Sequence, residues 1–186
     1  GHSLTLQKRE ISVQVKTATG MATRKKTVYR SHYGPVLARD GNRAFAFKSP
    51  NLDECRFVEQ WNLMTKARNL TEFRQALDMQ AIPMFNIWYA DRDGNVFYIW
   101  NGRFPDRPAG YNWSGVVPGN VAASEWNRIL PTSRLPQLLN PPGNYVQNCN
   151  SAPWYTNLHA IIDRRNFPDF LCPNMNDLRQ QLSLEM

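Results

Sequence analysis

The stretch MFNIWYADRDGNVFYIWNG (residues 84–102) contains two apolar, aromatic-rich runs on either side of DRDGN (91–95). Aspartate, glycine and asparagine favour turns, and aromatic and β-branched residues favour strands. The stretch therefore predicts a β-hairpin. The spacing of its acidic residues superficially resembles a calcium loop, but the glycine is misplaced for an EF-hand and Gly102 stands where the final glutamate ligand would be. We therefore interpret this stretch as a hairpin and not as a calcium loop.

Upstream of the hairpin, the first third of the chain predicts an antiparallel sheet. REISVQVK (9–16) alternates apolar and polar residues, as a half-buried strand does. A turn over TATGMAT (17–23) precedes a second strand over 25–38, which we expect to be interrupted at Gly34-Pro35. A further short strand follows a turn at Asp40-Gly41.

Between this sheet and the hairpin, the sequence predicts two helices. We expect the first to open at Ser49-Pro50-Asn51, and FVEQWNLM (57–64) places three large apolar side chains on one of its faces. The second helix covers NLTEFRQAL (69–77), where Asn69 and Glu72 form a capping-box pattern.

After the hairpin we expect proline-rich loops to about residue 158 and a short helix over PNMNDLRQQLSLEM (173–186). The predicted class is α+β, with antiparallel strands, two helices packed on one face of a sheet, and long loops rich in proline and asparagine.

Composition limits the function classes. The chain has 186 residues, 42% of them hydrophobic, and a net charge of +7, which permits an anionic partner. The cations are scattered, and we interpret the densest cluster, Arg24 to Lys26, as a solvated strand edge. No apolar run reaches the roughly 18 residues of a membrane span.

The three cysteines, Cys55, Cys149 and Cys172, are widely spaced and form no CxxC pair. One disulfide is possible. A nucleophilic pair of Cys149 with His32 or His159 stays open, although plain packing is the commoner role of such a cysteine.

LNPPGNYVQNCNSAPWYTN (139–157) concentrates asparagine between proline breaks. These amides can bind the backbone of a loop. Alternatively, one of them can stand at a fixed point and donate a hydrogen bond to a reacting group.

The hairpin stretch NIWYADRDGNVFYIWNGRFPDRP (86–108) resembles the signature N-x-x-Y-A-D-x-x-G-N-I-x-Y of the penicillin acylase family of N-terminal-nucleophile hydrolases. Three further stretches resemble family motifs and keep their order: SHYGPVL (31–37), WNLMTKARNLTEFRQAL (61–77), and 117–150, which runs from VPGN to NYVQNCN. The resemblance spans residues 9–186. HYGPV and NCNS are closer to the branch that acts on acyl-homoserine lactones.

The resemblance implies a fragment of an αββα N-terminal-nucleophile fold. In that family an N-terminal serine attacks the amide carbonyl, with its own α-amino group as base. Ser3 follows Gly1-His2 and lies in a stretch similar to the region well beyond the nucleophile. We therefore interpret residues 1–8 as a tag remnant and the start of a strand, and residues 9–186 as one domain fragment of a catalytic β subunit.

The resemblance also implies site residues. Asn150 matches an asparagine that donates to the oxyanion, and Arg179 matches an arginine that helps to orient this region. Trp61 and Phe85 match positions that line the acyl pocket. Ser151 departs from the usual second asparagine, which puts the neighbouring network in question. Trp113 replaces a proline among the family's calcium ligands, most of which lie outside this stretch, and we therefore predict no metal site.

The resemblance thus predicts a hydrolase that cleaves the amide of N-acyl compounds, such as acyl-homoserine lactones or the side-chain amide of β-lactams. It implies no cofactor. The expected partners are the small-molecule substrate and the remaining acylase segments, with no nucleic acid and no membrane, in the periplasm or outside the cell. The isolated chain is expected to be inactive. The alternatives are a basic module that binds nucleic acid or another anionic ligand, and a non-catalytic homologue.

Overall fold

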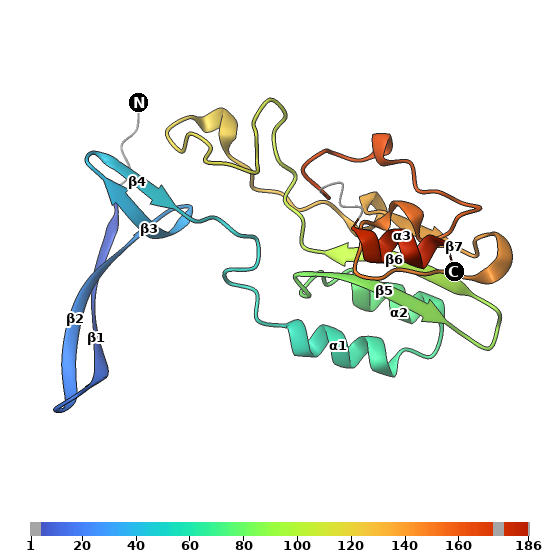
Figure 1. The fold of residues 1–186 in the computed structure, drawn as a ribbon, viewed down its shortest axis with the longest axis horizontal. Helices are drawn as coiled ribbons and strands as arrows, with labels where there is room; N and C mark the ends of the chain where they lie inside the picture. Colours follow the sequence, from blue (N-terminus) through green and yellow to red (C-terminus); the bar gives the residue numbers. More distant parts are fainter. Residues whose placement is uncertain (1–4, 173–176, 186) are drawn as a thin grey trace. The chain divides into compact units, whose positions relative to one another are not determined.

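The computed structural model describes residues 5–172 and 177–185. The chain divides into two compact units, Gly1–Leu52 and Asp53–Met186 (Figure 1). The assignment of residues 9–186 to one domain stays a prediction.

The first unit is an antiparallel sheet in the order β1-β2-β3-β4. Its strands are β1 (Gln7–Thr17), β2 (Gly20–Ser31), β3 (Gly34–Asp40) and β4 (Arg43–Ala46). β1 and β2 pair along their length, from Gln7 opposite Arg30 to Thr17 opposite Gly20. The predicted strand at 9–16 and the short fourth strand are confirmed, whereas the turn predicted at 17–23 is only two residues long.

The interruption predicted at Gly34-Pro35 lies slightly earlier, because the chain turns at His32-Tyr33 and β3 begins with Gly34. Gly34 has a φ of +139°, and a Cβ there would lie 2.2 Å from the carbonyl oxygen of Phe47. Only glycine fits this close approach of two backbone segments. Gly34 is also the only buried residue among the described residues 5–52, so this unit relies on strand pairing more than on a core.

The second unit combines helices with an antiparallel sheet in the order β5-β6-β7. Its strands are β5 (Met84–Ala90), β6 (Val96–Gly102) and β7 (Gln137–Leu139). Its α-helices are α1 (Phe57–Lys66), α2 (Leu70–Leu77) and α3 (Leu178–Glu185). Among the described residues, single-turn 3₁₀ helices interrupt the loops at Ala122–Ser124, Thr132–Arg134, Pro142–Asn144, Pro153–Tyr155 and Arg164–Asn166. The hairpin prediction is confirmed, whereas β7 was missed.

The helix boundaries follow from local hydrogen bonds. α2 starts as predicted, because Asn69 Oδ1 accepts from the Glu72 N–H at 2.9 Å and Glu72 reaches back to the Arg68 N–H at 2.9 Å. The predicted start of the first helix is wrong: Ser49–Asn51 forms a turn, and α1 begins at Phe57. For the helix predicted at 173–186, residues 173–176 and 186 lie outside the described residues, and 178–185 are helical.

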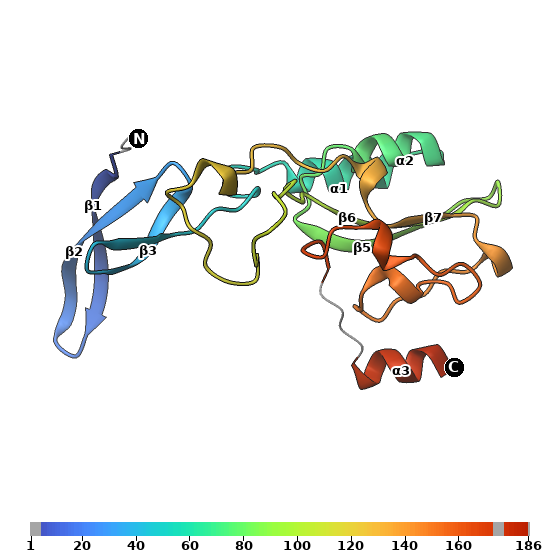
Figure 2. The same ribbon diagram turned by 90° about the horizontal axis from the view of Figure 1, so that it is seen from above.

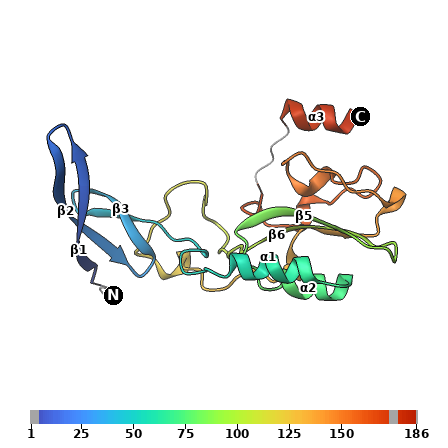
Figure 3. The same cartoon turned by 90° about the horizontal axis from the view of Figure 1, so that it is seen from below.

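β6 lies at the centre of the core, with residues 97–102 buried. α1 and α2 cover one face of the β5–β6 sheet and the loops after β7 cover the other (Figures 2 and 3). The largest side chains that are fully enclosed are Phe97, Tyr98, Leu77, Ile82, Ile99, Leu130 and Leu135. The α+β class and the two helices on one face are confirmed.

Within the described ranges, no helix combines the length and the apolarity that crossing a bilayer requires.

Candidate functional site

The amides of the asparagine-rich segment do not all serve one purpose. Asn140 Oδ1 accepts from the Val96 N–H at 2.8 Å and so joins the segment to β6. Asn157, which is fully buried, donates to the carbonyls of Pro142 and Tyr145 at 2.9 and 3.0 Å. Asn148 bridges the backbone N–H and carbonyl of Ser151. These three amides hold the loop, as the first interpretation of the segment expects.

Backbone conformation explains a further part of the asparagine content. Asn140, Asn144 and Asn150 have φ values of 48°, 50° and 68°. This left-handed region is unfavourable for most residues with a side chain, and asparagine tolerates it better than most. The segment can therefore turn three times without a glycine at these positions.

The side chain of Asn150 contacts another element. Arg179 Nη1 on α3 donates to Asn150 Oδ1 at 3.3 Å, and both residues are exposed. In the described ranges 5–172 and 177–185, no hydrogen bond of the Asn150 Nδ2 group is seen. Because the arginine engages the oxygen, the amide presents its NH₂ group as the donor.

α3 has its own cap and makes one further contact with this segment. Asp177 Oδ1 accepts from the Gln180 N–H at 2.7 Å and thereby caps the start of the helix. Ser183 Oγ donates to Gln147 Oε1 at 3.0 Å. The structure therefore places Arg179 next to Asn150, a contact between residues 29 positions apart.

Trp61 on α1 and Phe85 on β5 also lie together, with ring centroids 6.1 Å apart in an edge-to-face arrangement. Neither ring is buried: Trp61 is 47% and Phe85 45% exposed. The buried residue of α1 is Gln60, so the helix directs an amide inward and its aromatic rings outward.

The Asn150–Arg179 pair and the Trp61–Phe85 pair lie on different faces of the sheet formed by β5, β6 and β7. Side chains alternate along a strand, and Phe85 and Tyr89 contact rings on α1 and α2. Trp88 points the other way and lines a cavity of about 480 Å³ with Val146 and Asn148. Trp88 was not among the residues predicted from the sequence. The available signal was its position three residues after Phe85, since side chains an odd number of residues apart on a strand point to opposite faces.

The hairpin turn is organised around Asp91. Its carboxylate accepts from the Asp93 and Asn95 N–H groups, both at 3.0 Å, and from Tyr89 Oη and Asn95 Nδ2, both at 2.9 Å. The hydrogen bond from the Asn95 side chain is the first cause that holds the pKa of Asp91 below its ordinary value. Four donors occupy this carboxylate, which explains the turn without a cation.

Metal and thiol chemistry have little support in the described residues. No group of three or more His, Cys, Asp or Glu side chains there could hold a metal ion. The three cysteines, all described, are free thiols. Cys149 contacts Ser151 Oγ at 3.8 Å, and the His159 ring packs against Tyr145.

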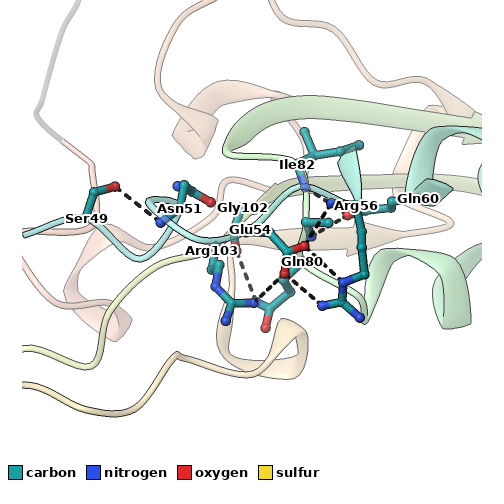
Figure 4. A network of polar contacts seen from close by, with 10 residues as sticks. Ser49, Asn51, Glu54, Arg56, Gln60, Gln80, Ile82, Gly102 and Arg103 are labelled. Atoms are coloured by element: carbon teal, nitrogen blue, oxygen red, sulfur yellow. Dashed lines mark hydrogen bonds and ion pairs between the residues drawn. The ribbon is translucent and has the colours of Figure 1, made fainter. Parts of the chain in front are cut away.

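A polar network lies at the start of α1 (Figure 4). Glu54 accepts from the Arg56 backbone N–H and Nε, both at 3.0 Å, and from Arg56 Nη2 at 2.7 Å. Arg103 Nη1 adds a contact at 3.4 Å. The hydrogen bond from the Arg56 side chain is the main cause that lowers the pKa of Glu54 from 4.5 to about 2.

We expect this network to make stability depend on acid pH. A carboxylate with a depressed pKa stabilises the folded state fully above its unfolded pKa, and this stabilisation is lost as the pH falls from 4.5 towards 2. Glu54→Gln lacks the charge at every pH. The difference in melting temperature between wild type and Glu54→Gln should therefore shrink across this interval. A difference that stays constant with pH would contradict the assignment.

Comparison with known proteins agrees with this architecture. A sequence profile of the family described as penicillin amidase matches residues 1–181. An acyl-homoserine lactone acylase PvdQ of Pseudomonas syringae is 30% identical over 87% of this chain and 24% of its own length. Penicillin G acylase of Escherichia coli is 31% identical over 68% of this chain and 15% of its own.

A solved structure of a thermostable penicillin G acylase from Alcaligenes faecalis superposes with a TM-score of 0.70 at 31% identity. It covers 80% of this chain and 27% of its own. The fold is therefore that of part of an N-terminal-nucleophile hydrolase. The chain belongs to the penicillin amidase family, and its relatives named above are acylases. It spans about a quarter or less of the length of these curated relatives.

Proposed function

We propose that the full-length protein containing this chain hydrolyses the amide bond of N-acyl compounds and releases a carboxylic acid and an amine. Asn150 donates from Nδ2 to the oxygen of the tetrahedral intermediate. The observation that carries this role is the hydrogen bond from Arg179 to Asn150 Oδ1, because it leaves the NH₂ group as the outward donor. A fixed donor at the developing oxyanion contributes roughly 3–4 kcal/mol to transition-state stabilisation.

The nucleophile and base in this proposal are supplied by a segment outside these residues. An N-terminal serine attacks the carbonyl carbon, and its α-amino group takes the hydroxyl proton and delivers it to the leaving amine; water then hydrolyses the acyl ester, releasing the carboxylic acid and the free serine. The remaining acylase segments are thus the partners of this chain, and we place the protein in the periplasm or outside the cell. The names of the relatives support acyl-homoserine lactones or penicillins as substrates.

The first test compares two preparations. The full-length protein should hydrolyse an N-acyl-homoserine lactone or a penicillin with release of free amine, and the 186-residue chain alone should not. If the full-length protein has no activity on either substrate, the alternative of a non-catalytic homologue is favoured. If the isolated chain turns over and Asn150→Ala abolishes this, the nucleophile lies within these residues and its proposed location is wrong.

We also propose that Trp61 and Phe85 receive the acyl group, because their exposed rings form an apolar surface that remains open to a ligand. In the full-length enzyme, Trp61→Ala should change the ratio of kcat/KM between long and short acyl chains about tenfold, while the amine preference stays similar. Because the ring is half exposed, the loss of stability should be well below the roughly 3–5 kcal/mol for a buried tryptophan.

Trp88→Ala is the informative comparison, because Trp88 lines the cavity beside Asn148 on the opposite face of the sheet. If Trp88→Ala alters chain-length preference and Trp61→Ala does not, the acyl group binds at that cavity and the assignment of Trp61 is wrong.

A further inference from the structure

Gln60 is an amide enclosed in the core of the second unit, with no exposed surface. Its Oε1 accepts from the N–H groups of Ala81 and Ile82 at 2.6 and 2.9 Å. Its Nε2 donates to Asn101 Oδ1 at 3.2 Å. Figure 4 shows the Gln60 side chain directed at Ile82. Both lone pairs of the oxygen are thus used by backbone donors.

These contacts connect the backbones that carry both aromatic rings of the proposed acyl site. Gln60 precedes Trp61 on α1. Ala81 and Ile82 lie directly before β5, which begins at Met84 and carries Phe85. Asn101 is the residue of β6 paired with Phe85. One side chain therefore links the helix that carries Trp61 to the segment that leads into β5 and to the Asn101 side chain on β6.

We infer that Gln60 is a positioning residue that sets the separation of Trp61 and Phe85 and, through it, the selectivity for the acyl group. This inference rests on the proposed acyl site. Gln60 touches no substrate and acts only through its hydrogen bonds to the segment before β5 and to Asn101.

An apolar residue at position 60 would leave two buried backbone N–H groups without a partner. Buried unpaired donors are unfavourable, so the segment before β5 would move until they found one. Phe85 would move with that segment while Trp61 stayed with α1. Displacements of about 1 Å are enough to change the fit of a substrate in its site.

The test uses the full-length enzyme with Gln60→Leu, Gln60→Glu and the control Asn62→Leu, which changes an exposed amide on the same helix. The substrates are homoserine lactones with acyl chains of graded length. We expect Gln60→Leu to change the ratio of kcat/KM between long and short chains by at least about threefold, with kcat on the best substrate nearly unchanged. Asn62→Leu should leave the ratio as in the wild type.

Gln60→Glu keeps an acceptor for Ala81 and Ile82, so its selectivity should lie closer to the wild type. It also serves as the test variant if Gln60→Leu does not fold, because loss of the donor to Asn101 should still shift the ratio in the same direction. Amide hydrogen exchange at Ala81 and Ile82 reports the contact without reference to activity. We expect faster exchange in Gln60→Leu.

Unchanged selectivity in a folded variant with faster exchange at Ala81 and Ile82 would show that Gln60 serves stability alone, and the inference would be wrong. If the proposed acyl site itself is wrong, the result is different, because Trp61→Ala would then also leave the selectivity unaltered. If Trp61→Ala shifts the acyl-chain selectivity and neither Gln60 variant does, the inference about Gln60 is wrong and the proposed acyl site stands.

Discussion

Asn150→Ala in the mature full-length enzyme should lower kcat by about a hundred- to a thousand-fold and leave KM almost unchanged. The carbonyl oxygen gains its full negative charge only in the tetrahedral transition state, so the donor matters most there. Asn150→Asp should be at least as harmful, because a carboxylate repels the oxyanion. Steady-state kinetics on protein shown to be cleaved would measure both, since maturation passes through a similar species.

The left-handed backbone of Asn150, with a φ of 68°, requires two controls. Asn150→Gly removes the amide without strain and should be as inactive as Asn150→Ala. Asn144→Ala makes the same change at an exposed residue with a φ of 50° in the same segment, and it should keep near-normal kcat. If the Asn150→Gly enzyme retained most of its kcat, the Asn150 amide would have only a structural role in the loop.

Phe97→Ala should lower the free energy of unfolding of the second unit by about 3–5 kcal/mol. Phe97 is 1% exposed in β6, and the Arg74 guanidinium lies over its ring, 5.4 Å from the centroid. A cavity of about 450 Å³ already borders the ring, so truncation enlarges an existing space. Urea unfolding followed by tryptophan fluorescence would measure the loss.

Phe85→Ala is the matched control, the same substitution on the adjacent strand. Phe85 is 45% exposed, so removal of its ring should cost less than about half as much stability. Equal losses for the two variants would show that β6 is not the centre of the core.

Much of the fold could be predicted because its signals are local. The turn residues 91–95 and the capping pattern at Asn69 specify a hairpin and a helix start, and both are confirmed. β7 was missed because its three residues pair with β6 from 38 or more positions away, and no local pattern marks such a contact. The start of α1 was placed too early, because proline and polar residues at 49–51 form a turn as readily as a helix start.

The residues of the candidate site could be predicted individually, but not which of them lie together. Resemblance to the family pointed to Asn150, Arg179, Trp61 and Phe85, and the structure brings them together as two separate pairs. Gln60 and Trp88 were not found. Buried and exposed amides look alike in a sequence, and the face of a strand that borders a cavity depends on what packs against it.

The sequence by itself determined the α+β class, the hairpin, the cap of α2 and the resemblance to the acylases, since each depends on neighbours along the chain. The tertiary structure alone decided that Asn140, Asn148 and Asn157 bind backbone while Asn150 meets Arg179. It also decided that α1 buries Gln60 and exposes Trp61. Identical amides differ only in which distant donor or acceptor the fold brings within hydrogen-bond distance, because such a bond acts over about 3 Å and sequence separation does not limit it.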